Sequence, residues 1–146
     1  MPPGTAGGLS MVPRNPEDMP PQSPFSLMLG IKVESCTPEE AVCSMLITEV
    51  MGNRNGVLHG GALMALADAA AGTSAFINSP AEITNTTVEA KTNFIRPVHV
   101  GDTITARSVP IHIGQTTAVL QVTLTRGDGK VVGSTSQTHL FMTWKD

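Results

Sequence analysis

The sequence contains little charge, few aromatic side chains and almost no cysteine. Of its 146 residues, 14 % are charged and 3 % are aromatic, with four Phe, one Trp, no Tyr and two Cys. The nine basic residues are scattered, and the formal net charge is −3. This excludes a positive stripe that could follow a phosphate backbone, so we expect no nucleic-acid partner.

Disulfides and membrane segments are also not expected. Cys36 and Cys43 are seven residues apart on one expected hairpin, which favours two free, partly buried thiols. No basic segment precedes an apolar run at the N-terminus, and the one long apolar stretch contains His59 and Asp68, which a membrane span disfavours. We therefore expect a soluble, cytoplasmic protein without membrane contact.

Length and composition indicate one globular domain. Residues 1–24 contain seven of the eleven prolines, so we expect a flexible tail there and a single domain over 25–146. The run FSLMLG predicts one helical turn that ends at Gly30.

The rest of the chain alternates between β-rich and helical patterns. Strand-like runs at 31–36 and 41–48 predict a hairpin, residues 59–77 predict a long helix, and four further strands are expected at 83–95, 102–113, 116–126 and 131–143. Short links between the last four predict an antiparallel meander. The fold class is therefore α+β, with an antiparallel sheet of about six strands curled around one central helix.

The expected helix has no polar face. Between Ala62 and Ala71 every residue is apolar except Asp68, which predicts a buried helix. A carboxylate in such surroundings has to be paired, neutralised or used in chemistry, and no Lys or Arg lies three or four residues away on the helix. Asp68 is either held by a distant partner or catalytic.

A loop with two glycines leads into this helix. The segment 53–61, NRNGVLHGG, places Gly60 and Gly61 where backbone N–H groups can approach an anion or a developing oxyanion. Gly60 and Asp68 lie roughly 12 Å apart along one helix, so they cannot act on the same carbonyl within one chain. Two antiparallel helices related by a twofold axis would bring them together, which predicts a dimer as the minimum unit.

The stretch from Asn53 to Ala75, NRNGVLHGGALMALADAAAGTSA, resembles the hotdog-fold thioesterases of the phenylacetate-pathway and 4-hydroxybenzoyl-coenzyme A group. The similarity continues through TVEAKTNFIRPV at 87–98 and, by strand pattern, over residues 25–142. The resemblance implies hydrolysis of an acyl-coenzyme A thioester to free acid and coenzyme A, with coenzyme A as part of the substrate, no other cofactor, and a tetramer built as a dimer of dimers.

The resemblance also implies roles for individual residues. Asp68 matches the carboxylate that acts as nucleophile or as general base, and the Gly60 N–H matches the group that polarises the thioester carbonyl. Asn53 matches a loop amide that binds this carbonyl. The substrate-binding residues it implies are His59, Gly61 and Thr87, with His59 positioning the loop and substrate and the Thr87 hydroxyl orienting the attacking water.

Two other functions remain open at this point: a hotdog hydratase or dehydratase, and a non-catalytic acyl-coenzyme A-binding module. His99, His112 and His139 lack the spacing of a metal site, so we expect no metal and interpret them as structural or surface residues. Arg96, Arg107, Arg126 and Lys130 are candidates for contact with the coenzyme's phosphates or are solvated strand ends. The preferred acyl group is not determined.

Overall fold

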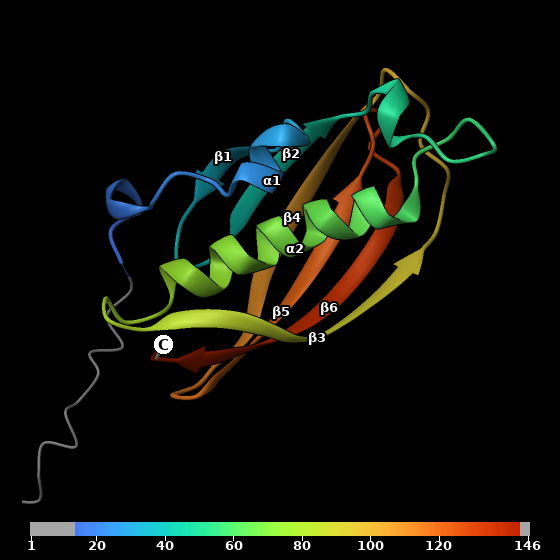
Figure 1. The fold of residues 1–146 in the computed structure, drawn as a ribbon. Helices are drawn as coiled ribbons and strands as arrows, with labels where there is room; N and C mark the ends of the chain where they lie inside the picture. Colours follow the sequence, from blue (N-terminus) through green and yellow to red (C-terminus); the bar gives the residue numbers. More distant parts are fainter. Residues whose placement is uncertain (1–13, 144–146) are drawn as a thin grey trace, which may run out of the picture.

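The computed structural model describes residues 14–143, which form one curled sheet around a long helix (Figure 1). In chain order the elements are η1 (Pro16–Asp18), α1 (Pro24–Met28), β1 (Lys32–Cys36), β2 (Ala41–Leu46), η2 (Glu49–Met51), α2 (Gly60–Ile77), β3 (Thr84–Phe94), β4 (Thr103–Ile113), β5 (Thr117–Thr125) and β6 (Val131–Met142). The predicted α+β hotdog architecture is confirmed, and the predicted strands and long helix agree to within two residues at each end.

The order of the strands differs from the predicted meander. All pairs are antiparallel and the order is β1-β2-β4-β5-β6-β3, so β3 pairs with β6 at one edge while β4 pairs with β2. The link between β3 and β4 is held by the loop before α2: Leu58 N–H donates to the Val98 carbonyl at 2.8 Å, and Val57 bridges His99. The link between β3 and β4 therefore leads to a strand that is not the neighbour of β3 in the sheet, instead of forming a hairpin.

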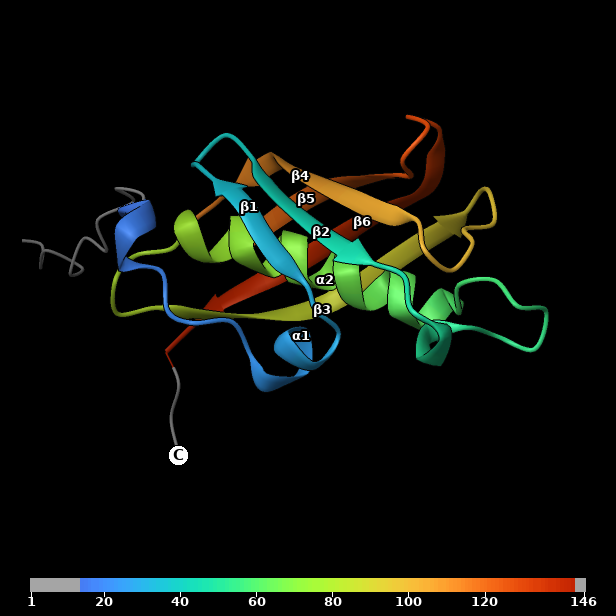
Figure 2. The same cartoon turned by 90° about the horizontal axis from the view of Figure 1, so that it is seen from above.

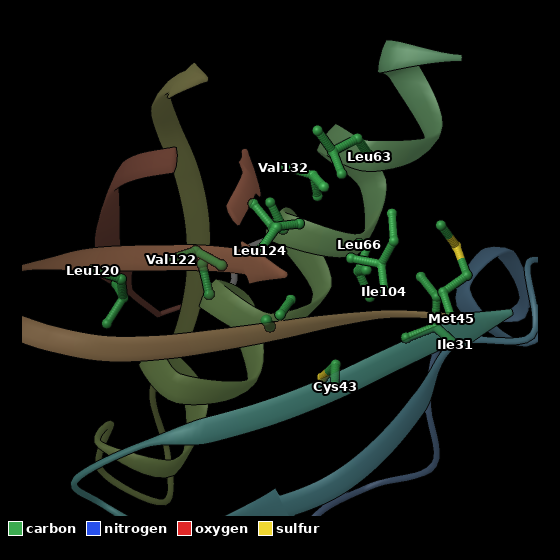
Figure 3. Packing of buried hydrophobic residues seen from close by; sticks show 14 of the residues in the cluster. Ile31, Cys43, Met45, Leu63, Leu66, Ile104, Leu120, Val122, Leu124 and Val132 are labelled. Carbon is green, nitrogen blue, oxygen red and sulfur yellow. The ribbon is translucent and has the colours of Figure 1, made fainter. Parts of the chain in front are cut away.

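The hydrophobic core lies between the sheet and one side of α2. Ala67, Ala70 and Ala71 are fully buried, and their small side chains let the helix approach the strands closely. The larger side chains of this core are Met45, Leu63, Leu66, Ile104, Leu120, Val122, Leu124 and Val132 (Figure 3). Both expected free thiols lie on the first hairpin, Cys43 buried and Cys36 half-buried.

The other side of α2 is open, which contradicts the prediction of a helix buried all round. Gly61, Met64 and Asp68 are exposed on this face, and Figure 2 shows α2 lying along a single curled sheet. The sheet covers one side of this helix, and residues on the opposite side stay exposed in the single chain. α2 is long and apolar enough to span a membrane by length and composition alone, criteria that the core helix of a soluble protein also meets.

The described part of the proline-rich segment is hydrogen-bonded to the end of α2 and to the residues that follow it. The Arg14 N–H donates to the Ile77 carbonyl at 2.8 Å, and its guanidinium lies 3.9 Å from the centre of the Phe76 ring. That guanidinium also donates to the carbonyls of Ser79, Pro80, Ala81 and Ile83. The boundary at residue 24 stays a prediction, and residues 1–13 of the expected tail lie outside the described residues.

Candidate active site

Asp68 lies in the middle of α2, on the open face of the helix. Its side chain is exposed in the single chain, contrary to the expected burial, because the sheet packs against the opposite face. The Thr87 hydroxyl, on the edge strand β3, donates a hydrogen bond to Asp68 Oδ1 at 2.9 Å. The structure therefore brings together two of the predicted site residues, 19 positions apart in sequence.

Asn53 organises the loop that precedes α2. Its side-chain oxygen accepts hydrogen bonds from the N–H groups of Asn55 at 2.8 Å and Val57 at 3.3 Å. Gly56 completes the turn with φ +76°, a conformation that other residues rarely adopt. With the oxygen engaged in the loop, the amide nitrogen of Asn53 is the end that can donate to a ligand.

The start of α2 leaves the N–H group of Gly60 without a partner within the helix. His59 is the N-cap, and its Nδ1 accepts a hydrogen bond from the Gly61 N–H at 2.9 Å. Gly60, as the first helical residue, has no carbonyl four residues back in the helix. Its Cα also packs so closely on Phe94 that an added Cβ would lie 2.9 Å from the ring.

The single chain divides the predicted site between different surface hollows. Asp68 lies in a groove of about 780 Å³ between α2, β1 and the segment 16–26. Asn53 and Gly60 line a smaller hollow of about 240 Å³, whereas His59 and Gly61 line a third of about 790 Å³. Gly61 also lines a fourth hollow of about 300 Å³, which it shares with Asp68. The Asp68 carboxylate and the predicted carbonyl-binding groups, Gly60 and Asn53, therefore do not line one common hollow within the chain.

Beneath Asp68 lies a polar residue whose position the sequence did not indicate. His139 on β6 is 1 % exposed, and its Nε2 is 3.5 Å from the Thr87 hydroxyl oxygen. Burial lowers the pKa of His139 from its ordinary value of 6.5, while the charge of Asp68 acts in the opposite direction. The only signal in the sequence is the alternation of Thr135, Gln137 and His139 along one face of a predicted strand.

The basic residues considered for phosphate binding have different surroundings. Arg107 pairs with Glu40, and Arg126 pairs with Asp128 at 3.0 Å. Arg96 donates to the Val131 carbonyl at 2.6 Å and lines the same hollow as Asn53 and Gly60. Among residues 14–143, no group of three or more His, Cys, Asp or Glu is placed to hold a metal ion.

Comparisons of the sequence and of the fold with known proteins both find thioesterases. The model of the thioesterase superfamily matches residues 55–133. The chain is 32 % identical over 104 residues to the acyl-coenzyme A thioesterase PaaI of Escherichia coli K12, covering 71 % of this chain and 72 % of that protein. The solved structure of the E. coli PaaI protein has a TM-score of 0.78 at 26 % identity, covering 83 % of this chain and 86 % of that chain.

A hypothetical thioesterase protein from Streptococcus pneumoniae TIGR4, solved with coenzyme A, shares the fold at a TM-score of 0.72 and 22 % identity, covering 80 % of this chain and 88 % of that chain. The matched family segment contains the helix with Asp68, the glycine pair and Thr87. The chain therefore belongs to the thioesterase superfamily and is a hotdog-fold thioester hydrolase.

Proposed function

We propose that the protein hydrolyses an acyl-coenzyme A thioester to the free acid and coenzyme A, at two equivalent sites shared between two chains. The observation that carries the proposal is the Asp68–Thr87 pair on the open face of α2, eight positions from the N–H of Gly60 on the same helix. An antiparallel partner helix would place its own Gly60 against this Asp68.

The proposed groups meet the chemical needs of thioester hydrolysis. The N–H of Gly60 and the side-chain amide of Asn53, from one chain, bind the carbonyl oxygen as it becomes negative. Asp68 of the other chain either removes a proton from the attacking water, which the Thr87 hydroxyl orients, or attacks the carbonyl carbon itself. A C–O bond forms to the water or to Asp68, the C–S bond breaks, and the thiolate of coenzyme A leaves and takes up a proton. On the second route water then cleaves the anhydride between the acyl group and Asp68, which releases the free acid and restores the carboxylate.

His59 and Gly61 support this arrangement without acting on protons. The His59 ring is used as the cap of α2, and an added Cβ at Gly61 would lie 3.1 Å from its Nδ1. The pair therefore fixes the helix start so that the N–H of Gly60, rather than that of Gly61, faces the substrate. Arg96, in the hollow of Asn53 and Gly60, is the basic residue best placed to contact a phosphate of coenzyme A.

This chain exposes apolar surface that a second chain would cover. On the edge strand β3, Val88 is 56 % exposed and Phe94 is 57 % exposed, beside the open face of α2. An unpaired edge strand with apolar side chains favours pairing with another strand. A further exposed apolar group, Leu27, Met28, Leu46 and Val50, lines the groove of His59, and it supports a second contact that would make a dimer of dimers.

The names of the relatives support an acyl-coenzyme A thioester as the substrate. The E. coli relative is an acyl-coenzyme A thioesterase, and the S. pneumoniae protein was solved with coenzyme A. The site of this chain contains the groups that such a reaction requires, whereas the preferred acyl group is a matter for experiment.

The proposal is tested by measuring thiol release from a panel of acyl-coenzyme A thioesters. We expect turnover by the wild type and a loss of about 10²-fold or more in kcat for Asp68→Asn, because the near-isosteric amide can neither accept a proton nor attack. Asp128→Asn is the matched control, since it removes an exposed carboxylate in the β5–β6 turn. Binding of coenzyme A without turnover of any thioester would instead indicate a binding module.

A further inference from the structure

The buried layer under Asp68 is polar where a hydrophobic core would be expected. Gln137 and His139, both on β6, are 2 % and 1 % exposed. The His139 ring faces the helix, since a Cβ built on Gly72 of α2 would lie 4.0 Å from its Cε1. Buried polar side chains destabilise a fold unless each finds a partner, so the contacts of these residues are informative.

The His139 ring is held on both sides by amide groups. Its Nδ1 lies 2.9 Å from the Asn85 side-chain oxygen, and its Nε2 lies 2.8 Å from the Gln137 side-chain oxygen. These two contacts fix the plane of the ring. They also place Nε2 at 3.5 Å from the Thr87 oxygen, at the outer limit of a hydrogen bond.

The Thr87 hydroxyl connects this layer to the reacting carboxylate. A hydroxyl has one proton, and that of Thr87 is donated to Asp68 Oδ1 at 2.9 Å. The oxygen therefore turns its lone pairs toward the His139 ring. A neutral ring has one N–H group. With its proton on Nε2 the ring donates to the Gln137 oxygen and faces the Thr87 lone pairs, and Nδ1 accepts a hydrogen bond from the Asn85 amide when that group presents its nitrogen. This tautomer favours the direction of the Thr87 hydroxyl, and with it the position of Asp68.

We infer that His139 is a positioning residue for thioester hydrolysis: through Thr87 it holds Asp68 in the orientation in which it acts. The inference rests on the proposed function, in which Asp68 is the reacting group. A second proton on the ring would place a buried positive charge behind the reacting carboxylate.

The surroundings of the ring agree with this role. In the described part of the chain, β3 contributes Asn85 and Thr87 to the surroundings of the ring, and β5 places Ala118 opposite it. The charged group that acts on the ring is Asp68 on α2. Burial keeps the pKa of His139 below 6.5, although the Asp68 charge raises it. The ring is therefore neutral at pH 7 and gains its proton only as the pH falls below 6.5.

The kinetic test compares His139→Gln with wild type, using His112→Gln as the control because His112 is exposed on β4. We expect kcat of His139→Gln to fall about tenfold or more with KM within about twofold, since misplacing a reacting group by 1 Å can cost about 10²-fold. The acid limb of the kcat–pH profile should also shift to lower pH, because the Gln side chain takes up no proton. Unchanged kcat and an unchanged acid limb would overturn the inference.

A substrate-free measurement separates this inference from the proposed function. NMR titration of the His139 ring should give a lower pKa in Asp68→Asn than in wild type, because the nearby negative charge is gone, and no change in Asp128→Asn. A wild type that shows this coupling but hydrolyses no thioester contradicts the proposed function alone. An active wild type whose His139 titration is the same in Asp68→Asn contradicts the positioning role.

Discussion

At the scale of single residues, Asp68 is exceptional because of what surrounds it in sequence, and Thr87 because of where the fold places it. The carboxylate is the one polar group in an apolar helix segment, so composition alone singles it out. The hydroxyl comes from a strand rich in threonine, Thr84–Phe94, in which only the family resemblance distinguishes it. The 2.9 Å hydrogen bond between them is a product of folding.

Replacing Thr87 tests the role of its hydroxyl. Thr87→Val keeps the shape but removes the donor to Asp68, so we expect kcat/KM to fall about tenfold, as for other changes that disturb the placement of a reacting group. Thr87→Ser keeps the donor and should retain most of the activity. Thiol release by both variants measures the difference; equal activity of Thr87→Val and wild type would show that the hydroxyl has no part in the reaction.

At the scale of elements, the predicted strands and helix are confirmed because each carries its own pattern. Alternating β-branched residues mark the strands, and the alanine-rich run marks α2. The pairing of β3 with β6 was not predictable in this way, since the two strands are far apart in the sequence and no pattern within either strand names its partner. Contacts between distant segments override the tendency of short links to form hairpins.

The end of α2 offers a test of how the N-terminal segment is fastened. Arg14→Met removes the donor to several carbonyls and the cation over the Phe76 ring, and we expect the free energy of unfolding to fall by about 1–3 kcal/mol. Arg54→Met, in the exposed loop before α2, is the control and should change it by less than about 0.5 kcal/mol. Urea denaturation measures both, and equal midpoints would show that Arg14 contributes no stability.

At the scale of the whole molecule, the proposed site requires two chains, and mixed dimers can test this. Asn53→Asp keeps the oxygen that orders the loop but removes the amide donor. Asp68→Asn removes the carboxylate. Each variant alone has the same defect in both sites, whereas a mixed dimer combines the intact Asn53 of one chain with the intact Asp68 of the other.

We therefore expect the two inactive variants, unfolded and refolded together, to recover about a quarter of the wild-type activity, because half of the dimers are mixed and each has one intact site. Variants refolded separately and then assayed together are the control. Light scattering should give the mass of a dimer or larger. A monomer at working concentration, or no recovery on mixing, would contradict the shared site.

The sequence by itself determined the α+β fold, the central helix and the residues that characterise the family, because hydrophobic periodicity and a short motif are local properties of the chain. It also singled out Asp68, Gly60 and Asn53, although it predicted burial for Asp68, which the fold leaves exposed. Only the tertiary structure decided that β3 lies at the sheet edge beside α2 and that His139 is buried under Thr87. These features depend on which distant segments pack together, and no pattern within a segment records that.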